Sequence, residues 1–357
     1  MYTRKDTRKL MVGNVQLGNQ NRCSIQSMTK TKTSNVVETV SQIQELVENG
    51  CEIVRVAVTN SDDAKAIAEI KKQVSCPIVA DIHFDYRLAL ESIEAGIDKI
   101  RINPGNIGSK DNVAAVVKAC KQRNIPIRIG INSGSIEKSI IDKHGKVTAQ
   151  GMIESAQKHI DILEELDFFD TCLSFKSSDV ILTIEAYRLA AEKWNYPLHL
   201  GVTEAGTLFS STVKSSCALG ALMIDGIGDT IRVSISGSPI EEIKVAKRIL
   251  KCFDLMDGMP ELVSCPTCGR IQYDMLEIIP EIEEFLSTIN SNIKVAVMGC
   301  AVNGPGEAKE ADIAIAGGLN EGLLIKKGVV IRKVPQQDIV KVLKEEILKE
   351  IEKTDIG

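Results

Sequence analysis

A short β-branched run followed by an amphipathic helical segment is repeated eight times between residues 20 and 255. The strand-like runs cover residues 24–29, 54–59, 77–84, 99–104, 126–132, 171–178, 197–203 and 230–236. The helical segments cover residues 35–49, 62–73, 87–94, 111–123, 153–166, 180–194, 210–224 and 241–253. Strands that alternate with helices form parallel βαβ units, and eight units of this size predict a closed (β/α)₈ barrel. An open doubly wound sheet is the alternative, but no Gly-x-Gly-x-x-Gly follows the first strand.

The strand-like runs carry an apolar face and an unusual polar face. Successive side chains of a strand point to opposite sides, so in residues 54–59 the three valines oppose Arg55, Ala57 and Thr59. The apolar face must meet the helices, and the polar face therefore looks into the barrel. The inward polar residues expected on this basis include Arg55, Arg101, Asn103, Arg128, Asn132, Ser174, Lys176, His199, Thr203, Arg232 and Ser234.

Five of these inward residues are cations that come from five different strands, and buried cations require partners. Internal salt bridges to Asp81, Asp85 and Glu204 are one explanation, but the cations outnumber the acids on this face. A polyanionic ligand is the sharper interpretation, because arginine binds phosphate or diphosphate in bidentate geometry and barrels bind ligands at their mouths.

The sequence leaves two roles open for each of the other polar residues at the strand ends. His83 and His199 have inward parity, and each is suited either to orient a neighbour or to act on substrate. Glu204 stands at the lip, where neighbouring cations favour its ionised, proton-accepting form; a charge partner for an arginine is the equal alternative. We expect His144 and His159 on the surface, and residues 133–151 to form a long polar excursion, either a lid or a passive insertion.

The composition is that of an ordinary globular protein, with 357 residues, 44% of them hydrophobic and 25% charged. A net charge of −5 does not suggest a nucleic-acid partner. No apolar run is long enough to span a bilayer, and the N-terminus lacks a secretion signal, so we expect a cytoplasmic protein with no membrane partner. Seven of the ten cysteines are scattered singly and are expected to be buried apolar residues or surface thiols.

After residue 253 the repeat ends, and residues 254–260 form a plausible linker. We therefore expect a barrel domain over residues 1–255 and a second domain over residues 256–357. In the second domain the sequence predicts a helix around 280–289, strands at 294–298 and 312–316, a hairpin through 323–334 and a final helix at 336–353. These elements predict a small α+β fold.

Two cysteine motifs mark this second domain. Residues 264–270 read SCPTCGR and residues 298–307 read MGCAVNGPGE, so Cys265, Cys268 and Cys300 are available as metal ligands. A zinc ribbon requires a second Cys-x-x-Cys pair, and a radical-SAM cluster requires three closely spaced cysteines. The third interpretation is a [4Fe–4S] cluster with one weaker ligand, since thiolates suit iron–sulfur clusters. We expect residues 303–306 to form a tight loop that brings Glu307 back as that ligand.

Four motifs together are similar to those of the 4-hydroxy-3-methylbut-2-enyl diphosphate synthase family, also called IspG or GcpE. They are the two cysteine motifs, residues 101–106 (RINPGN) and residues 200–206 (LGVTEAG). The resemblance runs over essentially the whole chain and is to the short bacterial form, because the last barrel helix leads directly into the cysteine domain. It implies a TIM barrel followed by a cluster domain related to the sulfite/nitrite reductase α+β unit.

The resemblance also implies an activity and roles for residues. The reaction would convert 2-C-methyl-D-erythritol 2,4-cyclodiphosphate to 4-hydroxy-3-methylbut-2-enyl diphosphate in the non-mevalonate isoprenoid pathway, with flavodoxin or ferredoxin as electron donor. It implies a homodimer in which one subunit's cluster domain covers the other subunit's barrel. Cys265, Cys268, Cys300 and Glu307 would hold the [4Fe–4S] cluster, and Asp81 and Glu204 would be the acid/base candidates. The residues expected to bind substrate are Arg55, Arg101, Asn103, Arg128, Asn132, Lys176, His199, Arg232, Ser234 and Asn303.

Two other classes of function remain as alternatives. A barrel aldolase or phosphate-handling lyase with a structural metal domain would require a Schiff-base lysine, for which Lys176 is the only inward candidate that we expect. An iron–sulfur sensor or cluster carrier would leave the five inward cations unexplained.

Overall fold

The computed structural model describes residues 4–300 and 304–356. The chain divides into two compact units, Met1–Leu255 and Met256–Gly357, which are described separately below. Within the described residues, no helix combines the length and the apolar character needed to cross a membrane.

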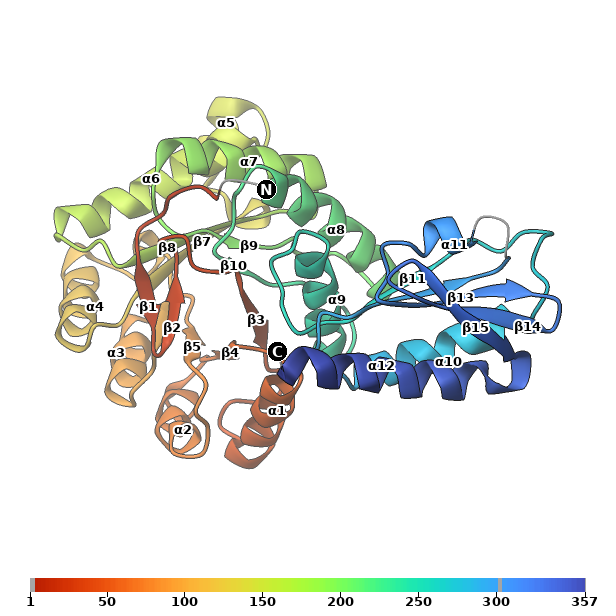
Figure 1. Cartoon of the computed structure of the whole chain (residues 1–357). Helices are drawn as coiled ribbons and strands as arrows, with labels where there is room; N and C mark the ends of the chain where they lie inside the picture. The colour runs from red at the N-terminus through yellow and green to blue at the C-terminus, as the bar shows by residue number, and fades with distance from the viewer. Residues whose placement is uncertain (1–3, 301–303, 357) are drawn as a thin grey trace. The chain divides into compact units, whose positions relative to one another are not determined.

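The first unit is built on an eight-stranded parallel sheet (Figure 1). Its strands are β3 (Ser24–Met28), β4 (Ile53–Ala57), β5 (Ile78–Asp81), β6 (Lys99–Arg101), β7 (Ile127–Asn132), β8 (Thr171–Lys176), β9 (His199–Leu200) and β10 (Thr230–Ile231). The order is β8-β7-β6-β5-β4-β3-β10-β9, and a parallel bridge from Leu173 to Leu198 joins β8 to the β9 segment. The barrel prediction is therefore confirmed, and the open sheet is excluded.

Eight helices form the outer ring of the barrel (Figure 1). They are α1 (Val36–Glu48), α2 (Ser61–Lys71), α3 (Tyr86–Glu94), α4 (Lys110–Arg123), α6 (Ala149–Glu165), α7 (Val180–Lys193), α8 (Leu208–Ile224) and α9 (Pro239–Lys251). Most begin at a polar residue whose side chain accepts a first-turn backbone N–H, as Asn60 does from Asp63 and Asp179 from Leu182. Such N-caps fix where each loop becomes a helix.

Two features of this unit were not predicted. Strands β1 (Leu10–Val12) and β2 (Val15–Leu17) form an antiparallel hairpin around Gly13, whose φ is +55°. Its apolar side chains pack against Ile53, Val79 and Cys172, which face the barrel interior at the amino ends of their strands. The excursion after β7 also contains structure, η2 (Ser133–Ser135) and α5 (Lys138–His144). The hairpin closes the amino end of the barrel with apolar contacts.

The second unit is a five-stranded mixed sheet of order β11-β12-β13-β14-β15. Its strands are β11 (Glu261–Ser264), β12 (Lys294–Met298), β13 (Ile313–Gly318), β14 (Glu321–Lys326) and β15 (Val329–Pro335). Strands β11 to β13 are parallel, and β13 to β15 are antiparallel. The predicted α+β fold is confirmed, with β11 as an edge strand that the sequence analysis missed.

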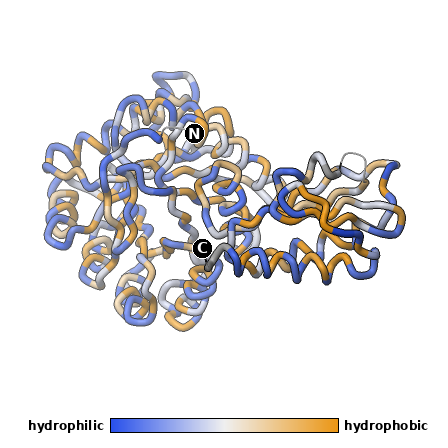
Figure 2. Tube along the Cα trace, viewed as in Figure 1, coloured by the Kyte–Doolittle hydropathy of each residue, from blue (hydrophilic) through white to orange (hydrophobic). Residues whose placement is uncertain are grey.

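Helices α10 (Met275–Ser287) and α12 (Ile339–Ile356) supply buried residues to one core of this sheet, and α12 follows the short turn η3 (Gln336–Asp338). The other core contains small residues such as Ala296, Ala314 and Ala316. Figure 2 shows apolar residues concentrated in the strands of the sheet. The predicted tight loop at 303–306 is corrected in part, because Gly304–Glu307 forms the one-turn helix α11.

Candidate functional site

A cavity of about 210 Å³ opens inside the barrel and is lined almost entirely by polar side chains. Its lining comprises Arg55, Asp81, His83, Arg101, Arg128, Gly130, Asn132, Ser174, Lys176, Thr203, Arg232 and Ser234. Most of these residues lie in the carboxyl-terminal half of a strand or just beyond it, where barrel proteins place their ligand sites, and Arg128 joins them because it is in register with Arg101, the last residue of β6. The five cations expected from strand parity therefore meet in one cavity.

Strand register explains why these side chains converge. Arg101 and Arg128 are paired Cα partners in β6 and β7, and Asn132 pairs with Lys176 between β7 and β8. The intervening Ile100, Ile127 and other apolar residues are fully buried on the opposite face of the strands. The helices thus cover the apolar face, and the polar face has only the barrel interior to enter.

Asp81 is the carboxylate that balances part of this charge. Its oxygens lie 3.8 Å from Arg55 Nε, 3.5 Å from Arg101 Nη1 and 3.7 Å from His83 Nε2. Burial opposes ionisation of Asp81, but Arg55, the His83 hydrogen bond and Arg101 outweigh burial and hold its pKa well below the usual range. Asp81 is therefore an ionised carboxylate in this structure.

Gly130 allows Arg101 to lie flat against the β7 backbone. Arg101 Nη2 donates a hydrogen bond to the Gly130 carbonyl oxygen at 3.1 Å. A Cβ at position 130 would lie 2.8 Å from Arg101 Nε, which is too close for any other residue without a shift of the guanidinium. Asn103 contributes from the other side, because its Oδ1 accepts the Gly130 N–H at 3.0 Å.

Arg128 is the most deeply buried cation of the cavity, with a relative exposure of 1%. Among the described residues, neither its Nε nor its Nη1 has a hydrogen-bond partner. Burial, Arg55 and Arg101 lower the pKa of Arg128 to about 9, so it remains charged at neutral pH. An unpartnered guanidinium in this position fits an anionic ligand that the cavity receives.

Lys176 and His199 form a second buried pair, with 3.3 Å between Nζ and Nε2. Burial, together with Arg128 and Arg232, lowers the pKa of Lys176 well below its ordinary value. Burial and Lys176 likewise lower the pKa of His199, which favours a neutral imidazole that accepts from the ammonium. His199 supports Lys176 and is not among the residues that line the cavity.

Arg232 is held by a carboxylate that the sequence analysis missed. Glu242 on α9 is 3% exposed, and its Oε2 lies 3.6 Å from Arg232 Nε. The same carboxylate accepts from Ser27 Oγ at 2.9 Å and from the Ile235 backbone N–H at 3.0 Å. A glutamate beside Ile243 on the apolar face of a barrel helix was the available signal, because a glutamate is rarely fully buried unless it is paired.

We expect Glu242→Gln to lower stability by about 2 kcal/mol, since it removes a charged acceptor from a buried site, and to tighten binding of inorganic diphosphate several-fold, since Arg232 no longer shares its charge with a carboxylate. Calorimetric titration and thermal unfolding measure the two effects. Glu241→Gln is the matched control, because Glu241 is in a partly exposed i,i+3 pair with Lys244. Equal behaviour of the two variants would contradict the anchoring role of Glu242.

Glu204 does not line the cavity. It is exposed on the loop after β9, and its φ is +51°, in the left-handed region that side chains other than glycine rarely adopt. Such strain is typical of functional sites. The sequence-based role of Glu204 at the lip thus remains a prediction.

Two further residues differ from the sequence-based expectations. His159 was expected on the surface, but it is buried, and its Nδ1 accepts the Gly105 N–H at 3.0 Å. It fixes the η1 turn (Pro104–Asn106) that follows β6. Lys176 was expected to be the only inward lysine, but Lys99 shares the inward face of β6 and is fully buried.

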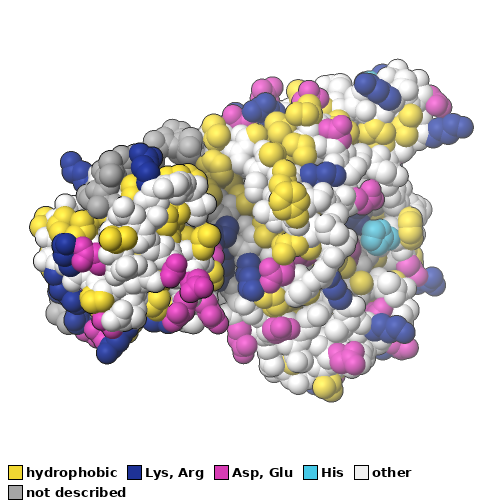
Figure 3. Space-filling model, turned by 90° about the vertical axis from the view of Figure 1, so that its right-hand side faces the viewer, with side chains coloured by type: hydrophobic (Ala, Val, Ile, Leu, Met, Phe, Trp, Pro, Cys, Tyr) yellow, Lys and Arg dark blue, Asp and Glu magenta, His cyan; other side chains and the backbone are white. Residues whose placement is uncertain are grey.

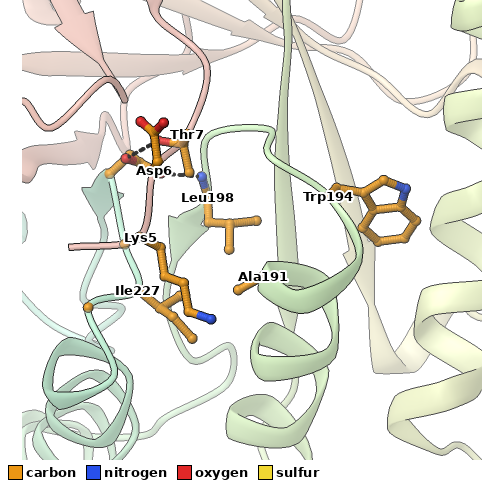
Figure 4. Close-up of a pocket in the computed structure, with 10 residues that line it drawn as sticks. Lys5, Asp6, Thr7, Ala191, Trp194, Leu198 and Ile227 are labelled. Atoms are coloured by element: carbon orange, nitrogen blue, oxygen red, sulfur yellow. Dashed lines mark hydrogen bonds between the residues drawn. The ribbon is translucent and has the colours of Figure 1, made fainter. Parts of the chain in front are cut away.

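A second cavity, of about 10 Å³, is lined by the N-terminal segment and residues of the β9–β10 region (Figure 4). Thr7 Oγ1 and the Leu198 backbone N–H both donate to Asp229, at 2.8 Å each. This cavity is too small for a substrate, and Asp229 and Leu198 lie at the amino ends of β10 and β9. Polar bonds in that position tie the N-terminal segment to the barrel.

In the second unit, neighbouring strand ends bring the two cysteine motifs together. Cys265 follows β11 and Cys300 lies two residues after β12, and the two strands are parallel neighbours with Ser264 paired to Val297. The Gly299 N–H donates to Cys265 Sγ at 3.1 Å, and a Cβ on Gly299 would lie 3.3 Å from that sulfur. The backbone therefore approaches Cys265 closely and provides a donor to its sulfur.

The donor set fits an iron–sulfur group in its chemistry, because soft thiolates and an N–H···S bond are what such clusters require. In the part of the chain that the structure describes, no three His, Cys, Asp or Glu residues are grouped closely enough to hold a metal ion. The Glu307 side chain and all of Asn303 lie outside the described residues. Their expected roles stay predictions.

Cations that meet in one cavity of a (β/α)₈ barrel are typical of the class of barrel proteins that bind an anionic ligand. Residues 7–247 match the model of the GcpE TIM-barrel domain, and residues 261–349 match that of the GcpE protein C-terminal domain. The chain belongs to the GcpE family.

Two curated relatives and one solved structure are similar to the chain. The 4-hydroxy-3-methylbut-2-en-1-yl diphosphate synthase (flavodoxin) of Bacillus mycoides is 58% identical over 347 residues, which cover 97% of this chain and 95% of the relative. The protein of the same name from Bacillus cytotoxicus is 59% identical over 344 residues, which cover 96% and 94%. Dihydropteroate synthase from Stenotrophomonas maltophilia, at 12% identity and a TM-score of 0.51, covers 70% of this chain and 97% of its own, and shows the barrel fold alone.

Proposed function

We propose that the chain converts 2-C-methyl-D-erythritol 2,4-cyclodiphosphate to 4-hydroxy-3-methylbut-2-enyl diphosphate in the non-mevalonate isoprenoid pathway. The observation that carries the proposal is the excess of buried cations in the barrel cavity, where Arg128 is unpartnered among the described residues. The names of relatives that match almost the full chain agree with it. Two electrons and two protons enter, the cyclic diphosphate opens at a C–O bond, and one water leaves.

In this proposal the barrel residues bind the substrate by its diphosphate. Arg55, Arg101, Arg128, Lys176 and Arg232 surround the anion, so that negative charge that develops on the departing diphosphate oxygen is neutralised. Asn132 and Ser234, which also line the cavity, are proposed to hydrogen-bond to the substrate's oxygens. Asp81 and Glu204 are the groups proposed to exchange protons with the substrate.

Cys265, Cys268, Cys300 and Glu307 are proposed to hold a [4Fe–4S] cluster, which supplies electrons one at a time when bound. Flavodoxin is the proposed electron donor, because it stands in the names of the relatives, and ferredoxin is the alternative. We propose a cytoplasmic homodimer. The face seen in Figure 3 carries acidic and basic side chains side by side, and with a net charge of −5 this does not resemble the basic surface of a nucleic-acid-binding protein.

The proposal predicts an iron-loaded, active protein after purification without oxygen. Iron and sulfide are assayed, and the cyclodiphosphate is supplied with a low-potential reductant while the product is followed by chromatography. Stoichiometric zinc without iron would refute the cluster assignment. A loaded cluster without turnover would favour a sensor or carrier, and a borohydride-trapped adduct at Lys176 would favour a lyase.

A further inference from the structure

Lys99 lies inside the barrel beneath the cavity and belongs to none of the roles described so far. It precedes Arg101 by two residues in β6, so both side chains share the inward face, and Lys99 is one layer nearer the amino end. Its relative exposure is 0%.

The amino end of the barrel offers this ammonium no exit to solvent. Lys99 pairs in register with Val79, and Val79 belongs to the apolar cluster that Ile53, Cys172 and the β1–β2 hairpin complete. A lysine normally extends its charged end to water. Here an apolar floor closes that direction, and the direction toward the cavity remains.

No acid faces Lys99 among the described residues that surround it. Its Nζ has no hydrogen-bond partner there, and the ionisable groups that act on it are the Cys172 thiol, Arg128 and Arg55. Three other strands contribute neutral polar groups whose buried atoms are also unpartnered, Gln26 from β3, His199 from β9 and Thr230 from β10. Asp81, from β5, is already shared by Arg55 and Arg101.

A buried ammonium without a counterion destabilises a fold, and a methionine would fill the same space without that penalty. An anion bound in the cavity would compensate the charge of the Lys99 ammonium and so explain why a lysine occupies this position. We propose that Lys99 is a positioning and electrostatic residue of the diphosphate site, which acts from below through Arg128 and takes up a proton when the anion binds. The inference rests on the proposed function, because it requires a diphosphate in the cavity.

The proton balance of this step follows from the surroundings of Lys99. Burial, together with Arg128 and Arg55 and against the opposing effect of Cys172, lowers the pKa of Lys99 to about 8. Near pH 8 part of the ligand-free protein therefore carries a neutral amine. A bound anion raises the pKa, so each binding event draws part of a proton from solvent at pH 8 and almost none from Lys99 at pH 6. Lys176, whose pKa is also lowered, adds to this uptake, whereas His199 stays neutral at pH 8.

The test is calorimetric titration of the full chain with inorganic diphosphate at pH 8, in two buffers of different ionisation enthalpy. For Lys99→Met we expect about tenfold weaker binding, as for loss of one charge near a partly buried anion. We also expect smaller proton uptake than in the wild type, and a higher Tm without ligand. A residue with a merely structural role would lower the Tm and leave proton uptake unchanged.

Lys118→Met is the matched control, because Lys118 is exposed on α4. Lys99→Gln, which keeps a polar end, is the second variant and is expected to lose the same proton uptake even if Lys99→Met folds poorly. If Lys99→Met or Lys99→Gln folds and matches the wild type in diphosphate binding and proton uptake, the inference about Lys99 is overturned, and the proposed function is unaffected. Failure of the wild type to bind diphosphate would overturn the proposed function with it.

Discussion

Replacement of Cys265, Cys268 or Cys300 by serine is expected to abolish turnover of the cyclodiphosphate, with a loss of more than about a hundredfold, because each replacement removes a soft thiolate ligand. Iron should fall from about four atoms per chain, the content of a [4Fe–4S] cluster, to a small fraction of that. Iron and sulfide assays and the visible absorption spectrum of protein prepared without oxygen measure the loss directly. Binding of inorganic diphosphate is expected to stay unchanged, because the cavity lining belongs to the barrel.

Cys217→Ser is the matched control for this prediction. Cys217 is exposed on α8, and we assign it no ligand role, so its loss should change neither iron content nor turnover. Full iron content in any one of the three variants would remove that cysteine from the ligand set. Full iron content in all three would refute the cluster site.

The fold could be predicted because the local pattern and the tertiary structure agree in nearly every unit. The β-branched runs, the polar N-caps and the apolar helix faces all point to the same alternation of strand and helix. The elements that were missed are short. Strand β11 has four residues, three half-buried and one exposed, and the β1–β2 hairpin has three residues per strand around Gly13-Asn14. Their stability comes from packing against distant strands, which no local window contains.

The site could be predicted as far as strand parity reaches. Parity places Arg55, Arg101 and Arg128 on the inward face because β-strands alternate strictly. Parity does not say which inward residues reach the cavity. His199 has inward parity, but it contacts Lys176 and does not line the cavity. Glu242 was missed because a helix on the far side of the strand supplies it. Lys99 has the same parity as Arg101, so the signal for its inward position was present in the sequence, but its depth below the cavity depends on register between strands.

The excess of cations has a physical consequence for the ligand-free barrel. Arg101, Arg128 and Lys176 are buried, and the side chains of Arg55 and Arg232 are only 11% and 15% exposed. Among the described residues, the buried carboxylates that pair with these cations are Asp81, with Arg55 and Arg101, and Glu242, with Arg232. The mutual repulsion and desolvation of the cations destabilise the ligand-free fold, and a bound diphosphate relieves both. Changes that add or remove one charge should therefore move stability and diphosphate affinity in opposite directions.

Asp81→Asn tests most directly whether stability and diphosphate affinity change in opposite directions. Loss of its charge leaves Arg55 and Arg101 without their carboxylate, so we expect the ligand-free protein to lose about 4 kcal/mol of stability. Binding of inorganic diphosphate should tighten about tenfold, because the anion no longer competes with a carboxylate. Turnover should fall nevertheless if Asp81 exchanges protons with the substrate. Denaturant unfolding, calorimetric titration and the reductive assay separate the three effects.

The difference in stability between the wild type and Asp81→Asn depends on pH because the Asp81 carboxyl group titrates. The pKa of Asp81 is held below its ordinary value in the folded state, so its contribution to stability is fully present above about pH 4, the unfolded value, and is lost as the pH falls through the folded value. The gap between wild type and Asp81→Asn should thus be constant near neutral pH and should narrow only in strong acid. Asp62 is an exposed residue in the first turn of α2. Asp62→Asn should therefore have the same stability and the same diphosphate affinity as the wild type. An Asp81→Asn protein that is as stable as wild type, or that binds diphosphate less tightly, would mean that the cations are compensated elsewhere and that their excess does not drive recognition of the substrate.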